Sequence, residues 1–191
     1  YEIGSGLVGS EMCIRDRSEP YRLYVAHILR TEVDSIMNIR SHPQAIIMGD
    51  FNDYPTNQSI LKILKAEAPP VKTNDLASTT DSANASTVTP SSLKLYHLLA
   101  RKAKSKNFGS YKFRGEWGLL DHLIVSGTLL NQSNHFFTSE EKANVCLLPF
   151  LLKDDEKYGD KEPFRTYKGM KYQGGISDHL PIYTDFELIV Y

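Results

Sequence analysis

The chain has little of three things that would assign it to a specialised class: cysteine, net charge and long apolar runs. It contains only Cys13 and Cys146, which excludes a disulfide framework and a cysteine-rich zinc site. The formal net charge is −1 over 191 residues. The average surface therefore offers no long-range attraction to nucleic acid and no polybasic membrane anchor. These counts leave the cellular compartment open.

Long apolar runs are also absent. The longest strongly apolar stretch, residues 145–152, is interrupted by Pro149 and is far shorter than the roughly 20 residues that span a bilayer. The sequence therefore predicts no transmembrane segment. A hydrophobic content of 41% with 24% charged residues is ordinary for one globular domain of 191 residues.

The first 17 residues differ from the rest because they show neither a helical nor a strand period. They begin with Tyr1 and lack the order of charge, apolar core and small residues that marks a signal peptide. The string from Gly9 to Arg17 resembles the translation of a cloning adapter. We therefore interpret residues 1–17 as a non-native, adapter-derived segment and residues 18–191 as the native domain. A native flexible tail is the alternative.

Beyond this segment the apolar pattern becomes regular. Apolar residues recur at three- and four-residue steps over residues 18–40, which predicts an amphipathic helix with Ser18 as its N-cap and Pro20 in its first turn. Residues 45–48 are typical of a buried strand, and Thr56 can cap a second helix after it. A strand followed at once by a helix indicates a layered α/β domain.

The later part of the chain combines one polar stretch with several short apolar segments. Residues 69–92 are rich in Ser, Thr, Ala and Asn and have almost no apolar period, which predicts a flexible surface insertion. Further elements are predicted where apolar residues return: a helix at 93–104 and strands at 110–113, 119–126, 144–151 and 181–190.

Polar side chains follow the first predicted strand. Asp50 and Asn52 lie two positions apart, so on extended chain both side chains can point to the same side. The amide can donate to a phosphate oxygen or hold a water, and the carboxylate can accept that water's proton or contribute to metal binding. The alternative is an Asx turn in which both side chains only satisfy backbone donors.

Two further polar strings lie beside predicted strands. Asp178 and His179 are adjacent, so on extended chain they point to opposite faces. The carboxylate of Asp121, which precedes an apolar run, could orient the ring of His179 and favour its charged form. A solvated acid at a strand end is the alternative for Asp121. Together these side chains suit metal-assisted attack on a phosphate ester.

Three strings, residues 49–52, 120–126 and 177–181, resemble in this order the endonuclease/exonuclease/phosphatase superfamily of deoxyribonuclease-like proteins. The resemblance covers about residues 18–191 and implies an α/β fold of the layered sandwich type. It also implies roles for individual residues. Asp50 and Asn52 match the pair that positions and activates the water, Asp121 matches the acid that supports the histidine, Asp178 matches a residue at or near the metal, and His179 matches the phosphate-contacting histidine.

One part of the family pattern has no match. The family's main metal-binding Glu and an Asn come from an N-terminal half, and neither precedes residue 18. Glu32 and Glu67 lie in predicted helices and lack the strand context of that Glu. The resemblance therefore implies that this chain represents roughly the C-terminal half of the fold. It also implies that the partner of this chain is the missing N-terminal half of the same domain. It also implies that the chain is inactive by itself.

Residues 101–114 hold six basic residues with aromatic residues among them, a composition that can contact phosphates or stacked bases. A solvated charged face is the alternative. Arg114 and Trp117 are the candidate substrate-binding side chains, and a buried anchor is the alternative for Trp117.

We therefore expect a divalent-metal-dependent phosphoester hydrolase that uses Mg²⁺ or Mn²⁺. Asp178 and Asp50 are the candidate metal ligands, and Asp50, Asn52, Asp121 and His179 are the candidate catalytic residues. A nuclease-type phosphodiesterase acting on nucleic acid is the first choice. A lipid or inositol phosphate phosphatase or phosphodiesterase is the alternative among enzymes, and a non-catalytic binding module of the same fold is the alternative outside them.

Overall fold

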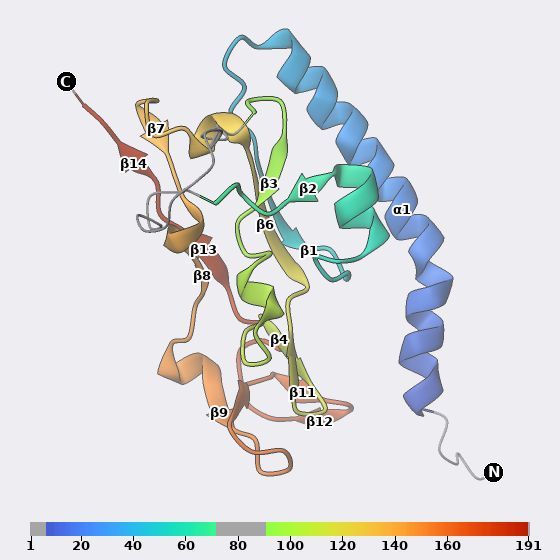
Figure 1. Ribbon diagram of the computed structural model, residues 1–191. Helices are drawn as coiled ribbons and strands as arrows, with labels where there is room; N and C mark the ends of the chain where they lie inside the picture. Colours follow the sequence, from blue (N-terminus) through green and yellow to red (C-terminus); the bar gives the residue numbers. More distant parts are fainter. Residues whose placement is uncertain (1–6, 72–90, 191) are drawn as a thin grey trace, which may run out of the picture.

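The computed structural model describes residues 7–71 and 91–190, which form a mixed α/β arrangement (Figure 1). The chain opens with a long helix, α1 (Leu7–Ile39), followed by strand β1 (Ile46–Asp50) and a short π-helical segment, η1 (Ser59–Leu64). The later strands are β2 (Ala66–Glu67), β3 (Leu95–His97), β4 (Tyr111–Phe113), β5 (Glu116–Gly118), β6 (Asp121–Ser126), β7 (Phe136–Phe137), β8 (Ala143–Val145), β9 (Leu152–Asp154), β10 (Lys161–Pro163), β11 (Tyr167–Lys168), β12 (Lys171–Tyr172), β13 (Ile182–Thr184) and β14 (Glu187–Leu188). Single 3₁₀ turns are η3 (Lys102–Lys104), η4 (Gly127–Leu130), η5 (Glu140–Lys142) and η6 (Pro149–Leu151).

Helix α1 begins earlier than the sequence predicts. It starts at Leu7, so Ser18 lies inside the helix and the prediction that it forms the N-cap is wrong. Pro20 also lies inside the helix, where its missing N–H leaves one carbonyl without its usual donor. The prediction failed because a helical proline is commonest in the first turn. The interpretation of residues 1–17 as adapter-derived stays a prediction.

One face of α1 packs on the sheet. Ala26, Val33 and Met37 are buried against Ile60 of η1 and Ile124 of β6. Arg30 donates from Nη1 to the carbonyl of Leu64 at 2.8 Å, which ties the helix to η1. Burial of each such aliphatic side chain contributes about 1.5–3 kcal/mol, so α1 is held chiefly by this stripe.

The central sheet has the strand order β1-β6-β3-β2. Strand β6 is antiparallel to both β1 and β3, and the short β2 pairs parallel to β3. In the β1–β6 ladder Asp50 lies opposite Asp121, which brings two acids of distant sequence to the same end of the sheet. The register of the sheet therefore fixes where these acids lie.

Strand β1 corrects another expectation, because residues 45–48 are not fully buried. The side chains of Ile46 and Met48 are 46% and 57% exposed, whereas Ile47 packs in the core beneath α1. Among the described strands, β1 lies at the edge of the sheet and pairs with β6 alone. A run of apolar residues in the sequence does not show how many neighbouring strands or layers will cover the strand that it forms.

A second apolar core lies on the other face of β6. Leu123 and Val125 point into it, together with Leu129 of η4, Val145 of β8 and Leu180. Strand β13 pairs with β8, and so brings the segment that contains His179 back to this face. The two cores together enclose β6 on both sides.

Four predicted elements differ in the structure. The second predicted helix is only the short segment η1, which has Gln58 and not Thr56 as its N-cap, and Glu67 lies in β2 instead of a helix. Residues 93–104 form β3 and the turn η3 instead of one helix, because a short apolar run can belong to either structure. The predicted strand at 144–151 is divided between β8 and η6, and the predicted strand at 181–190 is divided between β13 and β14. Most of the predicted insertion at 69–92, residues 72–90, lies outside the described residues.

Within residues 7–71 and 91–190, no helix is both long enough and apolar enough to cross a membrane.

Candidate active site

A carboxylate–imidazole pair occupies the end of β6. Nδ1 of His179 donates to Oδ2 of Asp121 at 2.7 Å. The segment containing His179 is held against β4, because the N–H of Leu180 donates to the carbonyl of Ser110 at 2.7 Å and Tyr111 forms an isolated β-bridge with His179. These backbone contacts therefore help to position the imidazole independently of its side-chain hydrogen bond.

Ser110 also supports the carboxylate directly. Its hydroxyl donates to Oδ2 of Asp121, the same oxygen that accepts the hydrogen bond from His179. Ser110 is completely buried, so this donor is held away from competing water. Sequence reasoning did not single out Ser110, because a lone serine before a strand carries no signal until its partner is known.

The two titratable groups shift one another's pKa in opposite directions. The hydrogen bond to Asp121 raises the pKa of His179, and partial burial opposes the rise without cancelling it. Burial by itself would raise the pKa of Asp121, but the hydrogen bonds from His179 and Ser110 outweigh it and leave that pKa below its ordinary value. The pair therefore favours an imidazolium beside a carboxylate.

Asp50 and Asn52 lie in the turn after β1. The N–H of Asn52 donates to Oδ1 of Asp50 at 2.8 Å, which is the Asx-turn contact that the sequence left open as an alternative. Asn52 has a φ of +52°, in the left-handed region that asparagine tolerates better than most residues. Both side chains are exposed, so the turn leaves them accessible to a ligand.

Asp50, Asp121 and His179 form a cluster in which one potential ligand atom of each lies within 4.8 Å of the others. The two carboxylates fit the oxygen preference of Mg²⁺ or Mn²⁺. The imidazole is already engaged by Asp121 and is a less usual donor for these ions. Asp178 is exposed and is not part of this cluster, although its charge helps to raise the pKa of His179. Its role at a metal stays a prediction.

A buried pair of histidines lies on the opposite side of the turn. The N–H of Leu99 donates to Nδ1 of His97, so Nε2 of His97 carries the proton and donates to Nδ1 of His122 at 2.6 Å. Nε2 of His122 then donates to the carbonyl of Asp53 at 2.8 Å. Both rings are fully buried, and this chain of hydrogen bonds requires both to be neutral.

The pKa values of this pair agree with its geometry. Burial, together with the neighbouring ring of His122, lowers the pKa of His97 to about 3. Burial also lowers the pKa of His122. The pair thus anchors the backbone just after Asp50 and Asn52. The sequence offered only a weak signal for it, namely one histidine inside each of two apolar runs.

The candidate substrate-binding residues lie along the β4–β5 hairpin. The guanidinium of Arg114 lies 5.2 Å from the centre of the Phe113 ring, and both side chains are exposed. Trp117 is half-buried against the second core, with Nζ of Lys112 at 5.9 Å from its ring. Lys112 is itself buried and pairs with Asp155 at 3.1 Å. This part of the basic run is therefore structural, and the substrate roles of Arg114 and Trp117 stay predictions.

Comparison with known proteins gives one match. A family model described as "Endonuclease/Exonuclease/phosphatase family" matches residues 8–188. The match spans most of the chain, includes residues 8–17, and gives no support to the expectation that only a C-terminal half is represented. No curated protein and no solved structure matches the chain.

Proposed function

The chain belongs to the endonuclease/exonuclease/phosphatase family, and on this premise we propose that it is a divalent-metal-dependent phosphodiesterase of the nuclease type. Members of this family are generally hydrolases of phosphoesters. The observation that carries the proposal is the 2.7 Å hydrogen bond between Asp121 and His179, with Asp50 at the same end of the sheet. The Asp121–His179 pair supplies a positioned cation, and Asp50 supplies a carboxylate that can take a proton.

The chemistry assigns a separate task to each group. Protonated His179 donates a hydrogen bond to a non-bridging oxygen of the phosphate and stabilises the charge that develops there. Asp121 orients the ring and keeps it protonated. Asp50 has a free oxygen that can accept the proton of an attacking water, while the amide of Asn52 holds that water or the phosphate.

A divalent cation would be held through Asp50 and Asp178 together with substrate oxygen. When bound, such an ion polarises the phosphate and neutralises part of its charge. Within the described residues, however, the carboxylates closest to His179 are Asp50 and Asp121, and each already accepts a hydrogen bond. Because Mg²⁺ gives up its waters reluctantly, we propose that the chain binds it weakly and has negligible multiple-turnover activity by itself.

Among substrate classes, nucleic acid is favoured by the exposed side chains of Phe113, the last residue of β4, and Arg114, which follows it. An exposed aromatic ring beside an arginine can stack a base and contact its phosphate. Lipid and inositol phosphates would suit the same Asp121–His179 pair, so they belong in the same substrate panel.

The test uses the chain in excess over labelled substrate, with Mn²⁺ or Mg²⁺ and with EDTA as the metal-free control. The substrates are a single-stranded oligonucleotide, bis(p-nitrophenyl) phosphate, p-nitrophenyl phosphate, inositol phosphates and phosphoinositide vesicles. We expect slow oligonucleotide cleavage that EDTA abolishes and that His179→Ala or Asp50→Asn lowers by about 10²-fold or more. His27→Ala is the matched control because His27 is exposed on α1.

Each alternative predicts a different result. Preferential hydrolysis of inositol phosphates or phosphoinositides would replace the nuclease assignment by the lipid or inositol alternative. Oligonucleotide binding that depends on His179 but leads to no cleavage would identify a non-catalytic module. Robust multiple turnover by the chain would refute the claim of weak metal binding.

A further inference from the structure

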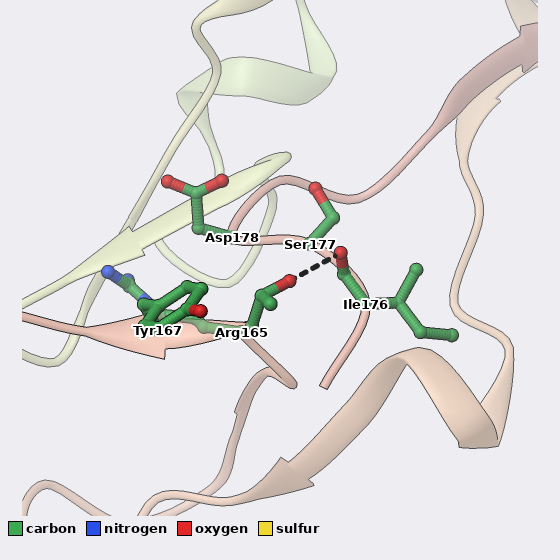
Figure 2. Close-up of a pocket in the computed structure, with 6 residues that line it drawn as sticks. Arg165, Tyr167, Ile176, Ser177 and Asp178 are labelled. Carbon is green, nitrogen blue, oxygen red and sulfur yellow. Dashed lines mark hydrogen bonds between the residues drawn. The ribbon is translucent and has the colours of Figure 1, made fainter. Parts of the chain in front are cut away.

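A pocket lies directly beside the segment that carries His179. Its volume is about 250 Å³, and Figure 2 shows the side chains around it. One wall is formed by Arg165, Thr166 and Tyr167 at the start of the β11–β12 hairpin, and the other by Ile176, Ser177 and Asp178. The walls are joined by the hydroxyl of Thr166, which donates to the carbonyl of Ile176 at 2.8 Å. The pocket thus lies between two segments that are tied together, and the second of these continues directly into His179.

Arg165 has unused hydrogen-bonding capacity in this pocket. One Nη2 proton is donated to the carbonyl of Lys112, and the guanidinium carbon lies 5.1 Å from the centre of the Tyr111 ring. Its Nε is buried, yet it has no hydrogen-bond partner among residues 7–71 and 91–190. Nor does any carboxylate of that part of the chain form an ion pair with it. Nη1 also has no acceptor in that part of the chain and, unlike Nε, is not buried, so it can donate to an acceptor supplied by a ligand.

Tyr111 connects this arginine to the Asp121–His179 pair. Its ring lies 4.9 Å from the imidazole of His179 at an interplanar angle of 41°, and Arg165 stacks on the same ring. The two cationic groups are therefore separated by a single aromatic ring and belong to one surface. A ligand that contacts His179 through one phosphate can place its next anionic group at Arg165.

We propose that this pocket is a subsite for a second phosphate group of the substrate, bound by Arg165 while the phosphate to be cleaved lies at His179. The proposal rests on the function proposed above and narrows it to hydroxylated esters with at least two phosphates. The planar guanidinium suits a phosphate because it can donate two parallel hydrogen bonds. Nucleotides with phosphates on both sides of the sugar and inositol bisphosphates share this chemistry.

Asp178 explains why a hydroxylated ligand fits better than a bare polyphosphate. Its carboxylate lines the same pocket, and within the described residues it forms no ion pair with Arg165. The negative charge of Asp178 would repel a further phosphate group placed beside it. A sugar or inositol hydroxyl, in contrast, can donate a hydrogen bond to this carboxylate. The pocket thus offers a donor for phosphate and an acceptor for a hydroxyl on the same sugar or inositol ring.

The experiment measures binding to the whole chain in EDTA, so that hydrolysis plays no part. Calorimetric titration compares uridine 3′,5′-bisphosphate, which keeps its 2′-hydroxyl, with uridine 5′-monophosphate, and inositol 1,4-bisphosphate with inositol 1-phosphate. We expect the bisphosphate of one pair to bind about tenfold more tightly, the ratio that one charge-assisted contact supplies. The pair that shows the preference identifies the source of the phosphates.

Variants then assign the preference to Arg165. Arg165→Gln should reduce the ratio of the two affinities to less than about twofold, and Arg165→Lys should retain part of it. Arg40→Gln is the matched control because Arg40 is exposed just after α1, and the C-terminal end of that helix lies far from β11 and β12 in Figure 1. Thermal melting of each variant shows whether it is folded.

The outcomes separate this inference from the proposed function. Equal affinities for bisphosphate and monophosphate in the unmodified chain would overturn the subsite even if phosphodiesters are hydrolysed. A bisphosphate preference that persists in folded Arg165→Lys and Arg165→Gln would overturn the role of Arg165. A preference that depends on Arg165 in a chain without hydrolytic activity would support the subsite and contradict only the proposed activity.

Discussion

Nδ1 of His179 lies 2.7 Å from Oδ2 of Asp121, although 58 positions separate the two residues in the chain. Asp121 begins β6, and His179 is held beside β4 by the backbone contact between Leu180 and Ser110. The pair is therefore a product of the tertiary fold, and changes to it should be visible in the titration of the imidazole.

Replacing Asp121 with Asn should lower the pKa of His179 toward the ordinary value of about 6.5, because the hydrogen bond to the charged carboxylate is its largest perturbation. In the unmodified chain the raised pKa stabilises the fold below about pH 6.5, and this contribution is lost as the pH rises through the folded-state pKa. NMR titration of the His179 ring measures the shift. An unchanged midpoint in Asp121→Asn would show that the pair does not control the ring.

Asn52 offers a prediction that separates stability from ligand binding. Because its φ is +52°, Asn52→Ala should destabilise the fold by about 1 kcal/mol, whereas Asn52→Gly should change it much less. Both variants lose the amide and should weaken phosphodiester binding to a similar extent. Urea unfolding and calorimetric titration give the two quantities. Equal destabilisation by both substitutions would contradict the role of the left-handed turn.

The buried histidine pair predicts acid sensitivity. Burial lowers the pKa of His97 to about 3, so its contribution to stability is present above about pH 6.5 and is lost as the pH falls toward 3. Loss of the His97 contribution alone should make the free energy of unfolding smaller by on the order of 2 kcal/mol at about pH 4.5 than at about pH 7. His97→Gln should reduce this difference, since an amide keeps a donor and an acceptor without titrating. His42→Gln, at an exposed position, should leave the difference unchanged.

Removal of residues 1–17 should alter the free energy of unfolding by no more than about 0.5 kcal/mol. The buried residues of α1 among the described side chains, Ala26, Val33 and Met37, all follow this segment. Urea unfolding of the full and shortened chains measures the change. A loss of several kcal/mol would show that the segment is part of the folded domain and not an adapter remnant.

Sequence reasoning could place the acids and His179 because each motif lies at the end of an apolar run, where a strand stops. It could not identify Ser110, since only the tertiary fold shows that its hydroxyl reaches Asp121. The start of α1 was missed for a local reason, because Pro20 is tolerated inside this helix. The exposure of β1 could not be predicted because it depends on the whole sheet. The number of neighbouring strands decides how much of Ile46 and Met48 is covered.

The proposed substrate-binding residues also could not be predicted from local sequence alone, because their neighbours in the fold lie far away in the chain. The sequence drew attention to Arg114 and Trp117 because they lie in a basic and aromatic run. Arg165 lies in another such segment, but its stacking on Tyr111 joins residues that are far apart in the chain. Only the folded arrangement distinguishes an arginine beside His179 from one on an exposed hairpin.

The neighbours Asp121 and His122 lie side by side in β6, yet one hydrogen-bonds His179 and the other hydrogen-bonds His97. Because successive side chains of a strand face opposite sides, inserting or deleting a single residue in β6 would exchange the surroundings of these two groups. One mutational event would then damage the active site and the anchor of its turn together. At the tip of the β11–β12 hairpin, Met170 is completely exposed. We therefore expect this tip to accept changes in length without such damage.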